Sequence, residues 1–144
     1  MEQTVVILKP DVFIKEERDE YSQLKKELPG AEKFIEYVQW KITELNLVIL
    51  NERKEQLSKE LVAVHYQEHK DNPAKFNSIL NNMTFWPCYL MLIEWIDSQK
   101  VIRALIMEIR EEFLSTAKVA RRNMIHASGN LDAAKFEAEL HFKK

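Results

Sequence analysis

His126 is the side chain in this sequence with the strongest case for chemistry. It follows the apolar pair Met124-Ile125 and precedes the small Ala127 and then Ser128, whose hydroxyl can donate and accept hydrogen bonds beside the ring. A histidine at the end of a strand, next to small residues, can present its imidazole to a cleft. The alternative is a partly buried histidine that bonds to the backbone, and taken alone the segment favours this plainer role.

Lys9 is the second candidate, because it follows the apolar block 5–8 and precedes Pro10. A lysine where a first strand ends can direct its ammonium at a phosphate as a compact charge. A solvent-exposed lysine at a strand end is the alternative. The only glycines are Gly30 and Gly129, and neither precedes a lysine, which excludes the glycine-rich phosphate loop and the three-glycine dinucleotide motif. Any phosphates must therefore be held by side chains.

A third pattern, His65-Tyr66-Gln67-Glu68-His69, fits the H-x-x-E-H string of inverted zinc proteases. On one continuous helix both histidines would face the same way, and a zinc site would still need a third ligand and an open position. Motifs of this length also occur by chance on solvated helices. We therefore favour the view that the string is not a metal site.

The elements that must position these residues alternate between strands and helices. Apolar spacing and helix-breaking residues predict strands at 4–9, 47–53, 87–95 and 121–126, and helices at 16–28, 31–45, 58–70, 74–82, 98–114 and 131–140. Such alternation favours an α/β sandwich of one sheet covered by helices. A length of 144 residues fits a single domain spanning 1–144.

Composition excludes several classes of function. Apolar residues make up 46% and charged residues 31% of the chain, as in ordinary globular proteins, and the formal net charge of −2 implies no broad nucleic-acid-binding field. The longest apolar run, 85–93, contains Pro87 and is too short to span a bilayer. Cys88 is the only cysteine, so no intrachain disulfide can form. We expect a cytoplasmic protein that binds neither membrane nor specific nucleic acid.

Six pieces of the chain occur in the order seen in nucleoside diphosphate kinases, and the sequence resembles that family. The pieces are Val5–Asp11, His65-Tyr66, Met83-Thr84 with Pro87, Arg103-Ala104-Leu105, Ile109-Arg110 and Arg122–Ser128. The resemblance implies an α+β sandwich with a ferredoxin-like four-stranded antiparallel sheet covered by helices. It also implies transfer of the γ-phosphate of a nucleoside triphosphate to a nucleoside diphosphate, by a ping-pong reaction through a phosphohistidine. Mg²⁺ would be bound through the nucleotide phosphates.

The resemblance also assigns roles to individual side chains. It makes His126 the nucleophile, and it makes Glu137 the carboxylate that holds the other ring nitrogen and so fixes the tautomer. Positive charge over the phosphate oxygens is what phosphoryl transfer most needs. The remaining assignments are Lys9, Arg103 and Arg110 as cations at the phosphates, Tyr66 near the transferred phosphate, Asn123 at the sugar hydroxyls and Phe76 as the nearest candidate for an aromatic clamp on the base.

The sequence departs from the family in ways that leave a second interpretation open. Residues 12–30 look like an insertion, and Val12 and Gly129 stand where the family has glycine and an acidic residue. The long loop between the two arginines is almost absent, so Arg103 and Arg110 fall on one helix, seven residues apart (110 − 103). Because that loop supports the larger assemblies of the family, we expect a homo-oligomer, most simply a dimer. The alternative function is a catalytically impaired regulatory or interaction domain.

Overall fold

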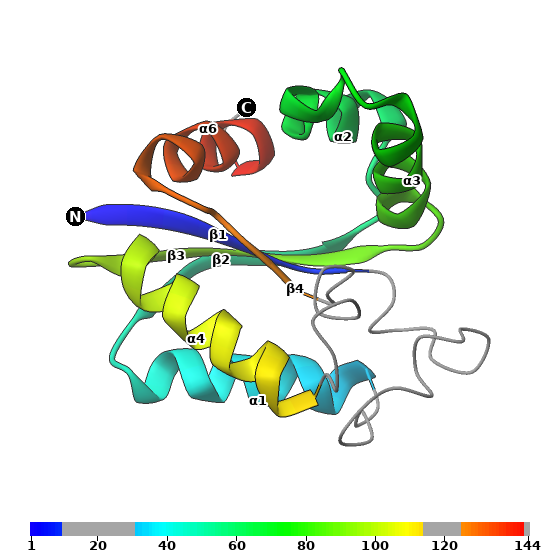
Figure 1. Cartoon of the computed structure of the whole chain (residues 1–144). Helices are drawn as coiled ribbons and strands as arrows, with labels where there is room; N and C mark the ends of the chain where they lie inside the picture. The colour runs from blue at the N-terminus through cyan, green and yellow to red at the C-terminus, as the bar shows by residue number, and fades with distance from the viewer. Residues whose placement is uncertain (10–30, 114–124, 143–144) are drawn as a thin grey trace.

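The computed structural model describes residues 1–9, 31–113 and 125–142 (Figure 1). The expected helix at 16–28 and the proposed insertion at 12–30 lie outside the described residues. In chain order the elements are β1 (Glu2–Leu8), α1 (Ala31–Glu44), β2 (Val48–Glu55), α2 (Lys59–His65), the 3₁₀-helix η3 (Gln67–His69), α3 (Pro73–Thr84), β3 (Cys88–Trp95), α4 (Ser98–Phe113), β4 (Ile125–Ala127) and α6 (Leu131–Phe142).

The four strands form one sheet in the order β2-β3-β1-β4, and every neighbouring pair is antiparallel. The two long strands β1 and β3 lie in the centre, while β2 and the three-residue β4 form the edges. This order, with helices packed on the sheet, confirms the expected α+β sandwich of ferredoxin-like type.

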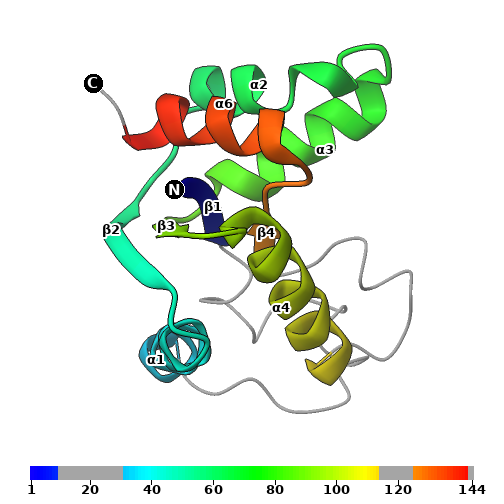
Figure 2. The same ribbon diagram turned by 90° about the vertical axis from the view of Figure 1, so that its left-hand side faces the viewer.

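The side chains of β1 alternate between two hydrophobic clusters, one on each face of the sheet. Val6 and Leu8 pack into a cluster with α1 and α4, whereas Val5 and Ile7 pack into a cluster with α2, α3 and α6. Figures 1 and 2 show the same division, with α1 and α4 on one side of the sheet and α2, α3 and α6 on the other. Because successive side chains of a strand point to opposite faces, a strand buried on both faces reads as the unbroken apolar run seen here.

The helix expected to run from Ser58 to Lys70 is wrong beyond His65. The Ser58 hydroxyl accepts a hydrogen bond from the N–H of Leu61 and starts α2 as predicted, but the backbone leaves the helical region at Tyr66 (φ −107°, ψ 24°). The chain continues as η3, so residues 65 and 69 do not share a continuous helix. This turn at Tyr66 brings the ring of that residue against His65.

Helix α4 confirms the expectation that both arginines occupy one helix, since it runs unbroken from Ser98 to Phe113. Its apolar side, which includes Ile102, Ile106 and Ile109, is buried against the sheet. Of the predicted strand at 121–126, only residues 125 and 126 are described, and β4 ends one residue later than expected, at Ala127.

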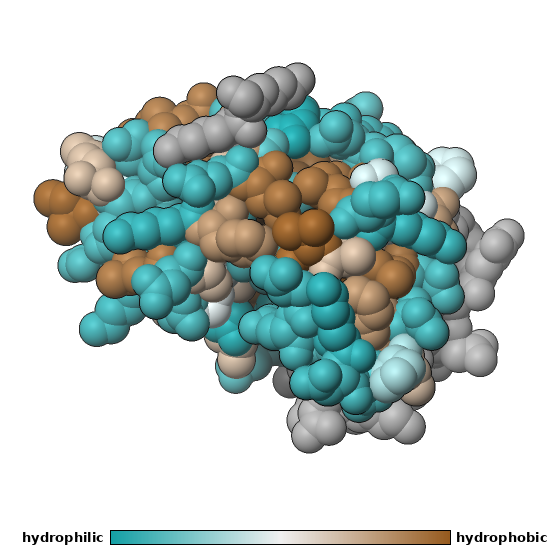
Figure 3. Space-filling model, turned by 90° about the horizontal axis from the view of Figure 1, so that it is seen from above, coloured by the Kyte–Doolittle hydropathy of each residue, from teal (hydrophilic) through white to brown (hydrophobic). Residues whose placement is uncertain are grey.

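The face formed by α2, α3 and α6 carries apolar surface near its middle with hydrophilic side chains around it (Figure 3). Among the described helices, none has the length and apolar content needed to cross a bilayer. Cys88 is buried in the cluster beneath this face.

Candidate active site

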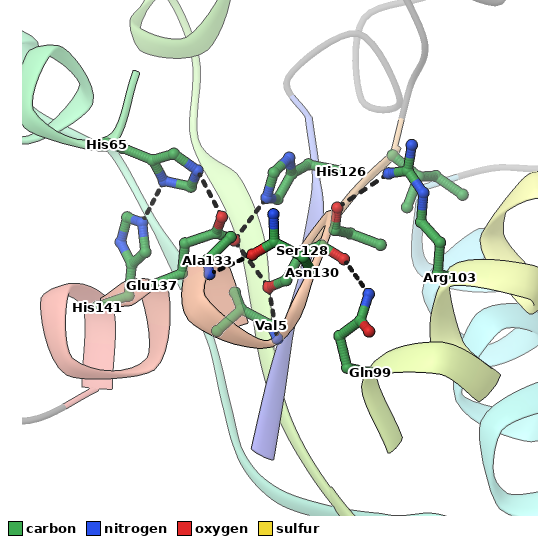
Figure 4. Close-up of polar contacts among 12 residues, drawn as sticks. Val5, His65, Gln99, Arg103, His126, Ser128, Asn130, Ala133, Glu137 and His141 are labelled. Carbon is green, nitrogen blue, oxygen red and sulfur yellow. Dashed lines mark hydrogen bonds and ion pairs between the residues drawn. The ribbon is translucent and has the colours of Figure 1, made fainter. Parts of the chain in front are cut away.

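The register of β4 decides which way His126 faces. His126 pairs with Ile7 of β1, and its neighbours Ile125 and Ala127 belong to the hydrophobic cluster beneath α1 and α4. The alternation of a strand therefore turns the His126 side chain to the opposite face, toward α2 and α6. Figure 4 shows the ring beside Glu137 of α6 and close to His65 of α2.

Glu137 binds the imidazole of His126. The distance from His126 Nε2 to Glu137 Oε1 is 2.6 Å, and the Ser128 hydroxyl donates to the same oxygen at 2.9 Å. Ser128 is held in turn by β1, because its Oγ accepts from the Val5 N–H and its own N–H donates to the Val5 carbonyl oxygen, each at 3.3 Å. Asn130 caps the start of α6 by accepting from the Ala133 N–H at 2.8 Å, which fixes the helix that carries Glu137.

The electrostatics of this pair favour a neutral imidazole beside an ionised carboxylate. Burial lowers the pKa of His126 from 6.5 to about 4, although the hydrogen bond and charge of Glu137 act in the opposite direction. Burial alone would raise the pKa of Glu137, but the hydrogen bonds from His126 and His65 outweigh it and hold that pKa well below its usual range. An ionised Glu137 accepts only, so His126 Nε2 carries the proton and Nδ1 keeps a lone pair. In Figure 4 the second ring nitrogen faces away from Glu137.

Two further histidines, His65 and His141, extend the chain of polar contacts from Glu137. His65 Nε2 lies 3.5 Å from Glu137 Oε2, and His65 Nδ1 lies 2.8 Å from Nε2 of His141. Both rings are buried. Tyr66 stacks on His65, with ring centroids 4.3 Å apart and planes 15° from parallel. Burial, and after it the charge of Glu137, raises the pKa of Tyr66, so its hydroxyl stays protonated.

A cleft of about 570 Å³ opens beside this group. Its lining brings together six of the sequence-predicted site residues, namely Lys9, Tyr66, Arg103, Arg110, His126 and Glu137. Phe76 lies on α3 but is not among the described lining residues, whereas Ile79 and Met83 of the same helix are. Asn123 lies outside the described residues. The Tyr66 hydroxyl is buried and has no hydrogen-bond partner in the described part of the chain.

The two arginines of α4 contact the backbone of β4. Arg103 Nη1 donates to the carbonyl oxygen of Ala127 at 3.2 Å, and Arg110 donates to that of Ile125 from Nε at 3.2 Å and from Nη2 at 2.6 Å. These carbonyls flank His126 on either side. Both guanidinium groups therefore hold the strand that carries the histidine while they also line the cleft.

The H-x-x-E-H string does not form a protease-type zinc site. The ring of His65 contacts Glu137, whereas His69 Nε2 lies 3.6 Å from Glu68 on the exposed 3₁₀ turn. Among the described residues, His65, His126 and Glu137 do place ligand atoms within 4.8 Å of one another. Two of these ligand atoms, His126 Nε2 and Glu137 Oε1, are already hydrogen-bonded to each other.

Sequence reasoning missed the contributions of His65 and His141. The sequence places His65 next to Tyr66, but the family resemblance assigns a role to Tyr66 alone. His141 is four residues after Glu137 on α6, and that spacing puts both side chains on one helix face. A buried carboxylate with a histidine one turn away was the signal that could have found it.

Comparison with known proteins gives a consistent result. The family model described as nucleoside diphosphate kinase matches residues 29–144. A nucleoside diphosphate kinase of Clostridium perfringens is 27% identical over 151 aligned positions, covering 100% of this chain and 93% of the relative. The crystal structure of a nucleoside diphosphate kinase family protein from Babesia bovis is 25% identical with a TM-score of 0.74, covering 99% of this chain and 88% of that one. A halophilic nucleoside diphosphate kinase from Halobacterium salinarum in complex with CDP shares the fold, at 22% identity and a TM-score of 0.71, covering 99% of this chain and 88% of that one.

Proposed function

The chain belongs to the nucleoside diphosphate kinase family, and we propose that it moves the γ-phosphate of a nucleoside triphosphate to a nucleoside diphosphate through phosphorylated His126. The observation that carries this proposal is the bond of 2.6 Å between His126 Nε2 and Glu137, beside a cleft whose lining includes Lys9, Arg103 and Arg110. A neutral imidazole with one nitrogen held and the other free is the form that attacks phosphorus.

In the first half-reaction the lone pair of His126 Nδ1 attacks the γ-phosphorus. The N–P bond forms as the bond from that phosphorus to the β,γ-bridging oxygen breaks, and the electron pair leaves with the diphosphate. No proton need leave His126, because Nδ1 carries none. The phosphorylated ring gains positive character, which the adjacent Glu137 carboxylate stabilises. A second nucleoside diphosphate then attacks the same phosphorus and restores the free histidine.

The cleft offers groups suited to a phosphate chain. Lys9, Arg103 and Arg110 supply positive charge, and the Tyr66 hydroxyl supplies a protonated donor without a described partner of its own. This lining suits an anion, and Glu137 is engaged by His126 and Ser128. Mg²⁺ held by the nucleotide's own phosphate oxygens fits such a site and would neutralise charge on those oxygens. We place no metal-binding protein residue here.

The finer features of the proposal follow the family. Nucleoside triphosphates and diphosphates are the partners, the sugar contacts Asn123, and the base is held by stacking, with Phe76 as the candidate clamp. Ile79 and Met83 add apolar surface within the cleft. We further propose a homodimer in the cytoplasm, because a chain whose only cysteine is Cys88 can form no intrachain disulfide and suits a reducing compartment.

The test is formation of a phosphoenzyme. The protein incubated with γ-labelled ATP should acquire label that acid removes and alkali does not, and addition of unlabelled GDP should move the label into GTP. His126→Ala should acquire none and should lose turnover, while its far-ultraviolet circular dichroism stays unchanged. Full turnover by His126→Ala with GTP and a deoxynucleoside diphosphate would refute the assignment of His126.

The alternative is a regulatory or interaction domain without catalysis, and the contacts of Arg103 and Arg110 with β4 are the observation in its favour. The N–H groups of Arg103 and Arg110 that donate to these carbonyl oxygens cannot donate to phosphates at the same time. The alternative predicts nucleotide binding without any acid-labile label on the protein. The labelling experiment therefore separates the two functions.

A further inference from the structure

Beside Glu137 lies the buried histidine pair, His65 and His141. The ring of His65 also lies edge-on against that of His126, with centroids 4.8 Å apart. From the geometry of the pair we infer that His141 is a positioning residue for phosphoryl transfer, which fixes the tautomer of His65 and through it the carboxylate of Glu137. This inference rests on the proposed function for its catalytic consequence, but its structural content concerns the resting protein alone.

The contact between the two rings requires one donor and one acceptor. A neutral imidazole has one N–H and one lone pair, so the 2.8 Å contact of His65 Nδ1 with His141 Nε2 allows two arrangements. In the first, His141 donates and the proton of His65 sits on Nε2, where it faces Glu137 Oε2 at 3.5 Å. In the second, His65 donates and turns the lone pair of Nε2 toward the carboxylate.

Burial favours the first arrangement at both ends of the pair. In the second, a lone pair would face an ionised oxygen in a site where both side chains are almost wholly buried. The second would also place a proton on His141 Nδ1, a buried atom with no hydrogen-bond partner in the described part of the chain. An unpaired buried N–H is costly. The first arrangement leaves only a lone pair at His141 Nδ1. The proton of His65 is then on Nε2, which makes no hydrogen bond of standard length either but faces the Glu137 carboxylate at 3.5 Å.

A His65 ring protonated on both nitrogens is disfavoured for the same reason, an unpartnered N–H on His141. It would have to donate from Nδ1 to His141 Nε2, which again puts the proton of His141 on the unpartnered Nδ1. The direction of the chain is thus His141 to His65, and His65 to Glu137.

This chain matters because it holds the oxygen of Glu137 that the nucleophile does not use. Oε1 accepts from His126 and from Ser128, while His65 is the ring that the described residues place against Oε2. A carboxylate that faces donors at both oxygens is restrained from rotating away from His126 Nε2. His126 then keeps its proton on Nε2 and its lone pair on Nδ1, the only tautomer that can attack from Nδ1.

The end of α6 is built to hold His141 in place. Helix ends fray, and His141 lies in the last turn of α6. Arg53 of β2, 88 positions earlier in the chain, donates from Nη2 to the His141 carbonyl oxygen at 2.5 Å and lies over the ring of Phe142 at 4.8 Å. The helix end is therefore tied to the opposite edge strand.

The test reads the tautomers directly, by long-range proton–nitrogen correlation spectra of the chain labelled with ¹⁵N at histidine. We expect both His65 and His141 to carry their proton on Nε2. His141→Phe removes the donor and keeps a ring, and it should release the tautomer of His65 and lower kcat about tenfold, the scale for outer partners of a functional group, with KM for the triphosphate unchanged. His141→Gln offers an amide N–H and should restore both. Glu139→Gln, exposed on the same helix, is the matched control and should change neither.

Each outcome bears on the inference. A proton on Nδ1 of His65 in the unaltered chain would overturn it, as would a His141→Phe variant with normal tautomer and normal kcat. If His141→Phe does not fold, His141→Met replaces it, and the spectrum of the unaltered protein still decides the direction of the chain. Failure of the unaltered protein to form a phosphoenzyme would reject the proposed function instead, because the tautomers are read without turnover.

Discussion

Arg110 holds the carbonyl oxygen of Ile125, the residue immediately before His126, through two guanidinium nitrogens at 3.2 and 2.6 Å. Burial, with the charge of Arg103 adding to it, lowers the pKa of Arg110 to about 10, and the group remains charged at neutral pH. Arg110 is a buried charged group that is bound to the backbone of β4, so its main role is to hold that strand in position.

Arg110→Met should therefore destabilise the fold as well as slow the reaction. Loss of charge-assisted bonds to a buried carbonyl costs about 2 kcal/mol, on the scale of hydrogen bonds to charged groups. Urea unfolding measures this cost. Arg103→Met, which removes one longer bond of 3.2 Å, is the comparison and should cost less. Equal stability of Arg110→Met and the unaltered protein would mean that the contact with Ile125 does not hold the strand.

Lys9→Ala should reduce phosphoenzyme formation by on the order of a hundredfold, the effect of removing one electrostatic stabiliser of the transition state. The reason is that Lys9 lines the cleft at the end of β1, and its charge also contributes to lowering the pKa of His126. Rapid-quench labelling with γ-labelled ATP gives the rate. Lys75→Ala, a second lysine of the cleft lining, tests whether any positive charge suffices. An unchanged rate in Lys9→Ala would remove Lys9 from the site.

Stability should fall as the pH drops from about 6.5 toward 4. In the folded chain burial lowers the pKa of His126 to about 4 and that of His141 to about 3, from 6.5 in each case. Between these values the unfolded chain binds protons that the folded chain does not, so the free energy of unfolding rises with pH across this window and is fully present above it. The lowered pKa of Glu137 acts with the same sign, below its ordinary pKa of 4.5.

Urea unfolding at pH 7.5, 6 and 5 measures this dependence. We expect a loss on the order of 4 kcal/mol between the first and last, because two rings each titrate over about 1.5 pH units below 6.5 at about 1.4 kcal/mol per unit. His141→Gln removes one of the two titrating rings and should give a shallower slope. A free energy of unfolding that is constant across this range would contradict the burial of neutral imidazoles.

The free edge of β2 should form a symmetric homodimer. This edge strand exposes Val48 and Leu50, and Trp40 of α1 is exposed nearby in the chain, at 44, 47 and 56% respectively. Apolar side chains on an unpaired strand edge favour association with another chain. Light scattering at micromolar concentration should report a dimer, and Val48→Lys with Leu50→Lys should report a monomer.

Ile96→Lys, at an exposed apolar position beyond β3, is the matched control and should leave the mass unchanged. A stable hexamer would show that another segment replaces the missing loop between the arginines. A monomeric unaltered chain would show that the dimer of the family is absent here.

Within the described residues, the order of the strands and α-helices and the pairing of His126 with Glu137 follow from the sequence, for local physical reasons. Apolar runs such as 5–8 predict buried strands by composition, and the order of the motifs indicates the family. The break of α2 at Tyr66 was not predictable, because residues 66–70 have ordinary helix formers and the chain leaves the helix to pack Tyr66 on His65. Tertiary contacts override weak propensities in this way.

The roles of Arg110 and His141 were hidden for a different reason. In a sequence that resembles a nucleotide enzyme, an arginine suggests a ligand for phosphate. The contact of Arg110 with Ile125, 15 positions away in the chain, depends instead on how α4 packs on β4. The contact between His65 and His141 joins positions 76 apart and depends on where α2 meets α6. Neither distance is encoded in spacing along one element.

The three-residue pairing of β4 with β1 makes activity depend on a choice between two states. A slip of one position would turn His126 into the apolar layer under α1 and α4, and would present Ile125 or Ala127 to the cleft. No intermediate orientation exists for a strand side chain. Substitutions that loosen β4 should therefore change how many molecules are competent, measured as the burst of label per chain, and leave the rate constant of each competent molecule as it was.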